Sequence, residues 1–137
     1  MRLIVRKVAI PLGVIIPVRG TAQTDHSDTA AKLILNGTLP SDNLAQTFMM
    51  TIVGRDVATK AIILSYILHF TVSRLATTYK VDRGSDSIMN NDDPDVEPDV
   101  IAVGTTNYRI NMTDTSGDLG VVDWAFSLQL LESISLA

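Results

Sequence analysis

The sequence predicts an α+β domain: an antiparallel meander sheet with an N-terminal hairpin and a C-terminal helix packed on one sheet face, completed in a dimer. Two observations predict this fold. Three internal runs alternate between apolar and polar side chains, which is typical of strands with one buried face. The segment 115–137 instead places apolar residues at helical spacing. The chain has 137 residues, of which 46% are hydrophobic, and this fits a single domain over residues 1–137.

The N-terminal third predicts extended structure and turns. Residues 2–10 (RLIVRKVAI) predict a strand, and residues 11–18 continue extended, interrupted by two prolines and a glycine. Residues 21–28 (TAQTDHSD) predict a polar loop. The pair Asn36-Gly37 is a strong signal for the tight turn of a β-hairpin.

The three alternating runs are residues 47–55, 62–74 and 100–113. Residues 56–60 join the first two runs and have the length of a hairpin link, whereas the long segment 75–99 joins the second run to the third. Together the runs predict neighbouring antiparallel strands with one apolar face that needs a cover. That face comprises Phe48, Met50, Ile52, Leu64, Tyr66, Leu68, Phe70, Val72, Ala102, Gly104, Thr106, Tyr108, Ile110 and Met112.

The C-terminal segment predicts the covering helix. Thr115 or Ser116 can cap its first turn, and Asp118 and Asp123 lie near its start, where the helix dipole favours anions. The helix is apolar around much of its circumference, which favours a contact with a second subunit, while deep burial within one chain is the alternative. The residues expected at the dimer interface are Val121, Trp124, Phe126, Leu128 and Leu131.

The sequence makes no positive case for an enzyme. It has no cysteine, which excludes disulfides and thiolate sites, and it holds no nucleotide-binding or zinc-protease motif. His26 falls in the predicted polar loop, and His69 falls on a polar strand face whose own sequence run contains no acid and no second histidine. We therefore expect no catalytic residues, no cofactor and no metal. No apolar run reaches the length of a membrane-spanning helix, so no membrane partner is expected.

Charge is unevenly distributed along the chain. Residues 1–83 carry a net charge of +5 and residues 84–137 a net charge of −9. Residues 90–99 are rich in carboxylates, but they lack the spacing and the central glycine of a calcium loop, so a calcium- or ligand-binding module is a minor alternative.

The polar faces of the three runs combine arginine with hydroxyls and amides, which can contact RNA phosphates. An ordinary solvated sheet face is the other interpretation. The residues predicted to face RNA are Thr51, Arg55, Ser65, His69, Thr71, Ser73, Asn107, Arg109 and Asn111.

The order of these elements over residues 45–135 resembles the coat proteins of single-stranded RNA bacteriophages of the levivirus type. Residues 47–74 resemble the central strand pair of that family, residues 96–113 the last strand with the loop before it, and residues 118–134 the helix. The resemblance implies a capsid subunit of the virion that dimerises and self-assembles into an icosahedral shell around single-stranded RNA. Residues 90–99 would then form the loop at the capsid axes.

A different class of function fits the same composition. The chain could be a secreted or surface β-rich filament or adhesion subunit in which residues 2–10 add a strand to a neighbour's sheet. Deleting this strand should then abolish polymers.

Overall fold

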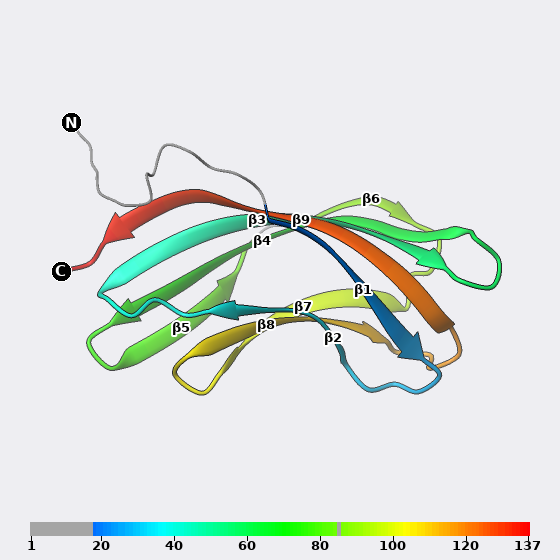
Figure 1. Ribbon diagram of the computed structural model, residues 1–137, viewed down its shortest axis with the longest axis horizontal. Helices are drawn as coiled ribbons and strands as arrows, with labels where there is room; N and C mark the ends of the chain where they lie inside the picture. The colour runs from blue at the N-terminus through cyan, green and yellow to red at the C-terminus, as the bar shows by residue number, and fades with distance from the viewer. Residues whose placement is uncertain (1–17, 85) are drawn as a thin grey trace.

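A computed structural model describes residues 18–84 and 86–137, and the strand predicted at residues 2–10 lies outside the described residues. Nine strands make up the secondary structure of the described residues, with no helix among them (Figure 1). In that part of the chain, no helix is long and apolar enough to cross a membrane. The strands are β1 (Val18–His26), β2 (Lys32–Thr38), β3 (Leu44–Asp56), β4 (Ile62–Leu75), β5 (Thr78–Arg83), β6 (Ser87–Asn91), β7 (Val96–Val103), β8 (Asn107–Asp114) and β9 (Gly120–Ser135).

The strands form two antiparallel sheets that lie one over the other. The large sheet has the order β1-β9-β3-β4-β5, with β6 paired to the other end of β4. The small sheet has the order β2-β8-β7. Figure 1 shows the large sheet arching over the small one, with β1 passing into β2 as the chain moves from one sheet to the other. The architecture is therefore a β-sandwich.

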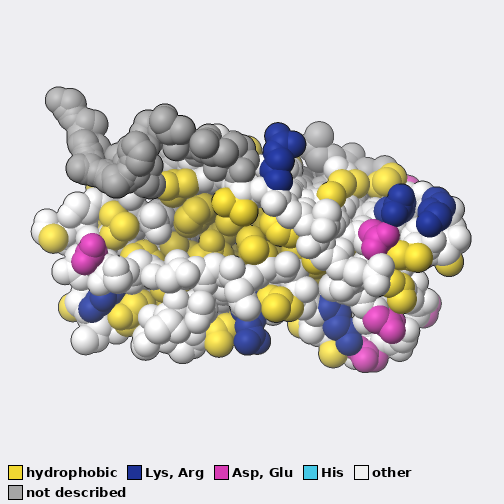
Figure 2. Space-filling view, viewed as in Figure 1, with side chains coloured by type: hydrophobic (Ala, Val, Ile, Leu, Met, Phe, Trp, Pro, Cys, Tyr) yellow, Lys and Arg dark blue, Asp and Glu magenta, His cyan; other side chains and the backbone are white. Residues whose placement is uncertain are grey.

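The core fills the space between the two sheets. Each long strand alternates, so one set of side chains points inward and the other set outward. The fully buried inward side chains include Met50, Leu68, Phe70, Ile110 and Trp124. In the face seen in Figure 2, apolar side chains gather in the middle and charged ones lie toward the periphery.

The predicted strand pair β3–β4 is confirmed. Met50 of β3 faces Leu68 of β4, and Phe48 faces Phe70 with their rings stacked at 5.3 Å. Every predicted apolar position on β4, from Leu64 to Val72, is buried. Alternation along the chain is a local property, so the sequence alone is sufficient to predict it.

The predicted C-terminal helix is wrong, and with it the α+β class. The segment forms β9, which pairs with β1 along residues 120–128 and with β3 along residues 122–135. Its buried residues are Val122, Trp124, Phe126 and Leu128, which repeat every second residue. Trp124 and Leu128 fit both a helical and a strand period, and the presence of β1 and β3 on either side decides for the strand.

The third alternating run is not a neighbour of the second. It divides into β7 and β8 at a turn in which Gly104 adopts a positive φ of 62°. Both strands belong to the small sheet, so Tyr108, Ile110 and Met112 pack onto the large sheet from the opposite side. The cover that the large sheet requires is therefore a second sheet.

Two predictions about the N-terminal region are also wrong. Residues 21–26 belong to β1 and do not form a loop, and His26 is fully buried. Asn36 and Gly37 lie within β2, opposite Arg109 and Tyr108, and do not form a turn. A Cβ atom at position 37 would lie 1.9 Å from Cζ of Tyr108, so glycine is required here because the tyrosine ring crosses the strand.

Arg83, at the end of β5, ties the two sheets together. Its Nη1 donates to the carbonyl oxygen of Pro98 in β7 at 2.7 Å, and its Nη2 donates to the Tyr66 hydroxyl of β4 at 3.0 Å. Its Nε donates to Asp86 at 2.8 Å. This arrangement also covers the edge of β7 at the proline.

Candidate functional site

A concave feature lies on the outer face of the large sheet. A shallow cavity of about 630 Å³ is lined by residues of β1, β3, β4 and β9, and a second cavity of about 320 Å³ adjoins it at Val53 and Ala125. We call the two cavities together the outer groove. Its lining includes Arg19, Thr21, Gln23, Thr51, Val53, Arg55, Ile62, Ser65, Asp123, Ala125 and Ser127.

Asp123 organises one end of the outer groove. Its Oδ1 accepts a hydrogen bond from Nε2 of Gln23 at 2.8 Å, and its Oδ2 lies 3.0 Å from Nη2 of Arg55. The hydrogen bond from Gln23 and the contact with Arg55 lower the pKa of Asp123 below its ordinary value. The contacts of Asp123 with Gln23 and Arg55 join three strands. Because these contacts are solvent-exposed, they contribute little to stability.

Six of the nine residues predicted to face RNA share the outer face of the large sheet. Thr51, Arg55 and Ser65 line the outer groove. His69, Thr71 and Ser73 continue along the same face of β4, where Thr71 shares a hydrogen bond of 2.9 Å with Thr47.

The other three predicted residues lie on the opposite side of the molecule. Asn107, Arg109 and Asn111 point outward from β8 in the small sheet. The sandwich therefore separates Arg109 from Arg55, and the predicted set does not form one surface.

Three of the five residues expected at the dimer interface lie in the core of this chain. Trp124 is 1% exposed, and Phe126 and Leu128 are also buried. Val121 and Leu131 keep about a third of their surface exposed. The inward side chains of residues 122–128 are thus buried by β-sandwich packing within this chain.

The acidic segment connects the two sheets. Asp92–Asp95 form the link from β6 to β7, and Glu97 and Asp99 point outward from β7. Burial raises the pKa of Asp93. Within the described ranges, no group of three or more potential metal-ligating side chains comes together.

A buried polar cluster lies between the sheets at the end of β1. The indole Nε1 of Trp124 donates to Oγ1 of Thr24 at 2.7 Å, and Oγ1 lies 2.6 Å from Nε2 of His26. The direction of the bond between Thr24 and His26 depends on which nitrogen of the imidazole carries the proton. The other ring nitrogen, Nδ1, has no hydrogen-bond partner in the described structure.

The environment of His26 favours its neutral form. Burial lowers the pKa of His26, and the carboxylate of Asp114 opposes this only in part. Asp114 is itself fully buried. Burial raises the pKa of Asp114, but hydrogen bonds from Ser116 and Leu119 lower it by more, so the pKa lies below its ordinary value. In this stretch of the chain, Ser27 donates to Asp25, whereas His26 bonds to Thr24.

Acidification should destabilise the fold through His26. Because the folded pKa lies below the unfolded value of about 6.5, the unfolded chain binds more protons, and stability falls as the pH drops from about 7 toward the folded pKa. Urea unfolding between about pH 7 and about pH 5 would measure this loss. The His26→Asn variant should lack most of it, and both proteins keep His69, so the difference reports on His26. Parallel pH profiles for the two proteins would contradict the prediction.

Comparisons with known proteins give structural similarities alone. No family model matches the sequence, and no curated protein matches it. The tailspike protein of Acinetobacter baumannii phage AM24 superposes over 96% of this chain and 28% of its own, with 8% identity and a TM-score of 0.48.

Two further tailspikes show a similar degree of likeness. That of Acinetobacter phage vB_ApiP_P1 is matched over 81% of this chain and 22% of its own, with 9% identity and a TM-score of 0.40. Gp49 of Acinetobacter baumannii phage Fri1, a capsular polysaccharide depolymerase, is matched over 89% and 21%, with 15% identity and a TM-score of 0.43. TM-scores below 0.5 do not establish a shared function.

Sequence reasoning missed Thr21, Gln23, Asp123 and Ser127 as lining residues of the outer groove. Their strands were predicted to be a loop and a helix, so their outward positions were not visible. The alternation of Val122, Trp124, Phe126 and Leu128 is the signal that could have revealed Asp123 and Ser127.

Proposed function

We propose that this chain is a β-rich structural subunit that assembles with copies of itself by strand addition. The observation that carries this proposal is an open position in the large sheet. Among the described residues, β9 pairs with β3 up to Ser135 but with β1 only up to Leu128, so residues 129–135 have a strand on one side alone. We call this position the open slot.

The open slot has the properties of a strand acceptor. Backbone groups that have no partner strand among the described residues can complete a ladder with an added strand. Apolar side chains flank it: Ile134 is 64% exposed, Val18 58% and Leu136 38%. Unpaired backbone beside exposed apolar side chains is the combination that strand addition satisfies.

Residues 2–10 of a neighbouring copy are the donor that we favour. This stretch is apolar, rich in β-branched residues and free of proline, whereas residues 11–17 contain Pro11 and Pro17, which cannot donate to a ladder. A chain continuing straight back from Val18 along β9 would bring its own residues 11–17 to the slot, since Val18 pairs with Leu128. The proline-free strand therefore suits the slot of another copy.

The proposal predicts that two different changes abolish assembly. Deleting residues 2–10 removes the donor, and Ile134→Asp places a charge at the acceptor; both should convert polymers into small species by light scattering and negative-stain microscopy. Ile101→Asp, an exposed isoleucine on the small sheet, is the matched control and should leave polymers intact. Polymers that survive both changes would exclude strand addition at this position.

A coat protein enclosing single-stranded RNA in a virion is the second candidate. One observation favours it: Thr51, Arg55, Ser65, His69, Thr71 and Ser73 share one sheet face. Negative-stain microscopy and absorbance of the assembled particles distinguish the two candidates. Closed shells with a nucleic-acid-like ratio of absorbance at 260 and 280 nm would favour the coat, whereas fibres without nucleic acid would favour strand addition.

A further inference from the structure

The exposed edges of the two sheets differ in how well they are protected. Pro98 interrupts the edge of β7, and Arg83 covers that edge by donating to the Pro98 carbonyl at 2.7 Å. The edge strand β2 is irregular, since its register shifts between Leu33 and Leu35. On the far edge of the large sheet, β5 is short and rich in charge, and β6 is short with a register shift. Short strands, prolines, bulges and charges are the usual means of preventing edge-to-edge pairing.

β1 lacks three of these protections, and its charged side chains, Arg19 and Asp25, lie near its two ends. It is nine residues long, pairs with β9 without a register shift, and contains no proline. Its inward-facing positions include Gly20, Ala22 and Thr24, which are small and uncharged residues. Among the described residues its other side has no strand partner. In an antiparallel ladder, alternate residues direct both N–H and C=O to that free side.

The sequence of β1 is complementary to itself in the antiparallel direction. When two copies pair about a two-fold axis at Ala22, Thr21 meets Gln23 of the second copy and Gly20 meets Thr24. Arg19 then lies opposite Asp25 of the second copy, and the symmetry repeats this contact. Opposite residues of a ladder share a face, so the two Arg19–Asp25 contacts both lie on the outer face of the extended sheet, one at each end of the paired strands.

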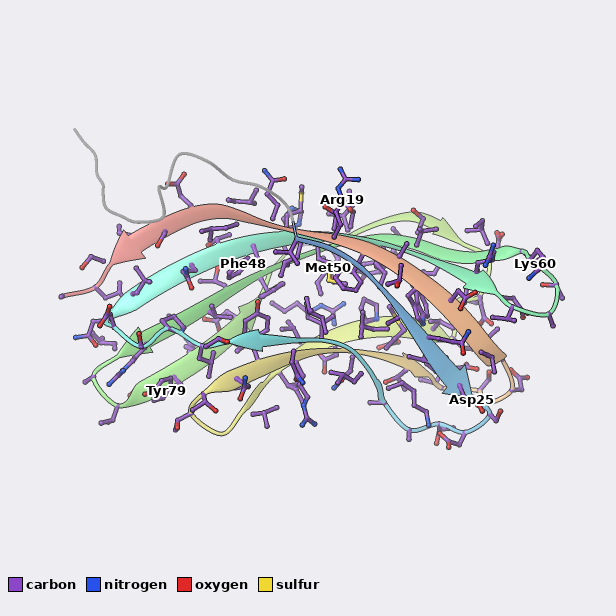
Figure 3. All side chains as sticks on the ribbon, viewed as in Figure 1. Arg19, Asp25, Phe48, Met50, Lys60 and Tyr79 are labelled. Carbon is purple, nitrogen blue, oxygen red and sulfur yellow. The ribbon has the colours of Figure 1, made fainter. Side chains whose placement is uncertain are left out.

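Both charged side chains are available for this contact. Arg19 and Asp25 are exposed at opposite ends of β1 (Figure 3), and Arg19 forms no ion pair with another described residue. Asp25 is held by Ser27, whose N–H and hydroxyl both donate to Oδ1. These hydrogen bonds lower the pKa of Asp25, which keeps it negatively charged.

We propose that β1 is a two-fold dimer interface, in which a second copy of this chain pairs antiparallel along β1 with Arg19 of each copy facing Asp25 of the other. The two large sheets then form one continuous sheet, and the outer groove, which Thr21 and Gln23 border at the β1 edge, extends into the second copy. This isologous contact closes on itself. It uses a different part of the sheet edge from the open slot, so it does not depend on strand addition.

Charge reversal provides the test, because the substituted side chains are exposed and outside the core. Arg19→Asp places two acids opposite each other, and Asp25→Arg places two bases opposite each other. Each variant alone should weaken dimerisation by about tenfold or more in sedimentation equilibrium. An equimolar mixture of the two variants should recover it as a heterodimer, because each contact then joins opposite charges. The Arg19→Asp/Asp25→Arg double variant should recover it as a homodimer.

The full-length Ile134→Asp protein separates this interface from strand addition. If both proposals hold, it sediments as a dimer of 14.8 kDa chains and becomes a monomer when Arg19→Asp is added. A monomeric Ile134→Asp protein overturns the β1 interface. Polymers that persist with Ile134→Asp overturn strand addition alone. Single reversals that dimerise as well as the unmodified chain, or a mixture no better than its components, also overturn the β1 interface.

Discussion

Replacing Trp124 by alanine is expected to destabilise the fold by roughly 3–5 kcal/mol. Trp124 is 1% exposed and lies in β9, between Ala22 of β1 and Gly54 of β3. The indole occupies the space that these small neighbours leave, since a Cβ atom on Gly54 would lie 2.3 Å from its Cζ3. Alanine would therefore open a large cavity and remove the donor to Thr24.

Trp124→Phe separates the two effects. Phenylalanine retains most of the packing but leaves Thr24 without its donor, so the loss should be about 1–3 kcal/mol. Urea unfolding followed by circular dichroism is the appropriate measurement, because the chain has a single tryptophan and the variants lose its fluorescence. If Trp124→Ala changed association while leaving the unfolding free energy unchanged, Trp124 would lie at an interface and not in the core.

Gly37→Ala is expected to destabilise the fold by roughly 3 kcal/mol, the upper part of the usual range for overpacking. The new methyl group would overlap the ring of Tyr108, with a closest approach of 1.9 Å to Cζ. That ring cannot move aside easily, because Tyr108 is 3% exposed. The centroid of its ring lies 5.4 Å from that of Phe70 and 6.1 Å from that of Phe48. Its burial raises the pKa of the Tyr108 hydroxyl to about 12.

Gly84→Ala is the matched control. Its Cβ atom would meet Cβ of His69 at 3.4 Å, an ordinary contact, so we expect a change within about 1 kcal/mol. Combining Gly37→Ala with Tyr108→Leu should cost less than the sum of the two single changes, because the smaller side chain makes room for the methyl group. Strict additivity in this cycle would show that Gly37 and Tyr108 do not compete for the same space.

The sequence predicted the candidate site only in part, for an identifiable reason. Thr51, Arg55 and Ser65 were assigned to one polar face because they alternate on two strands of a single hairpin. Asp123 pairs with Arg55 across 68 positions of the chain, and no local pattern encodes that pairing. Arg109 shows the reverse failure, because alternation identifies its strand but not the sheet to which the strand belongs.

By itself, the sequence determined the inward and outward faces of β3, β4 and β8, since a period of two is a property of each strand alone. The tertiary structure alone decided that residues 120–135 form a strand. The apolar side chains of that segment satisfy both periods, but only an extended backbone can form ladders with β1 and β3 together. The neighbours on either side thus override the local helical preference, and the large sheet gains an internal strand between β1 and β3 where the sequence predicted a cover.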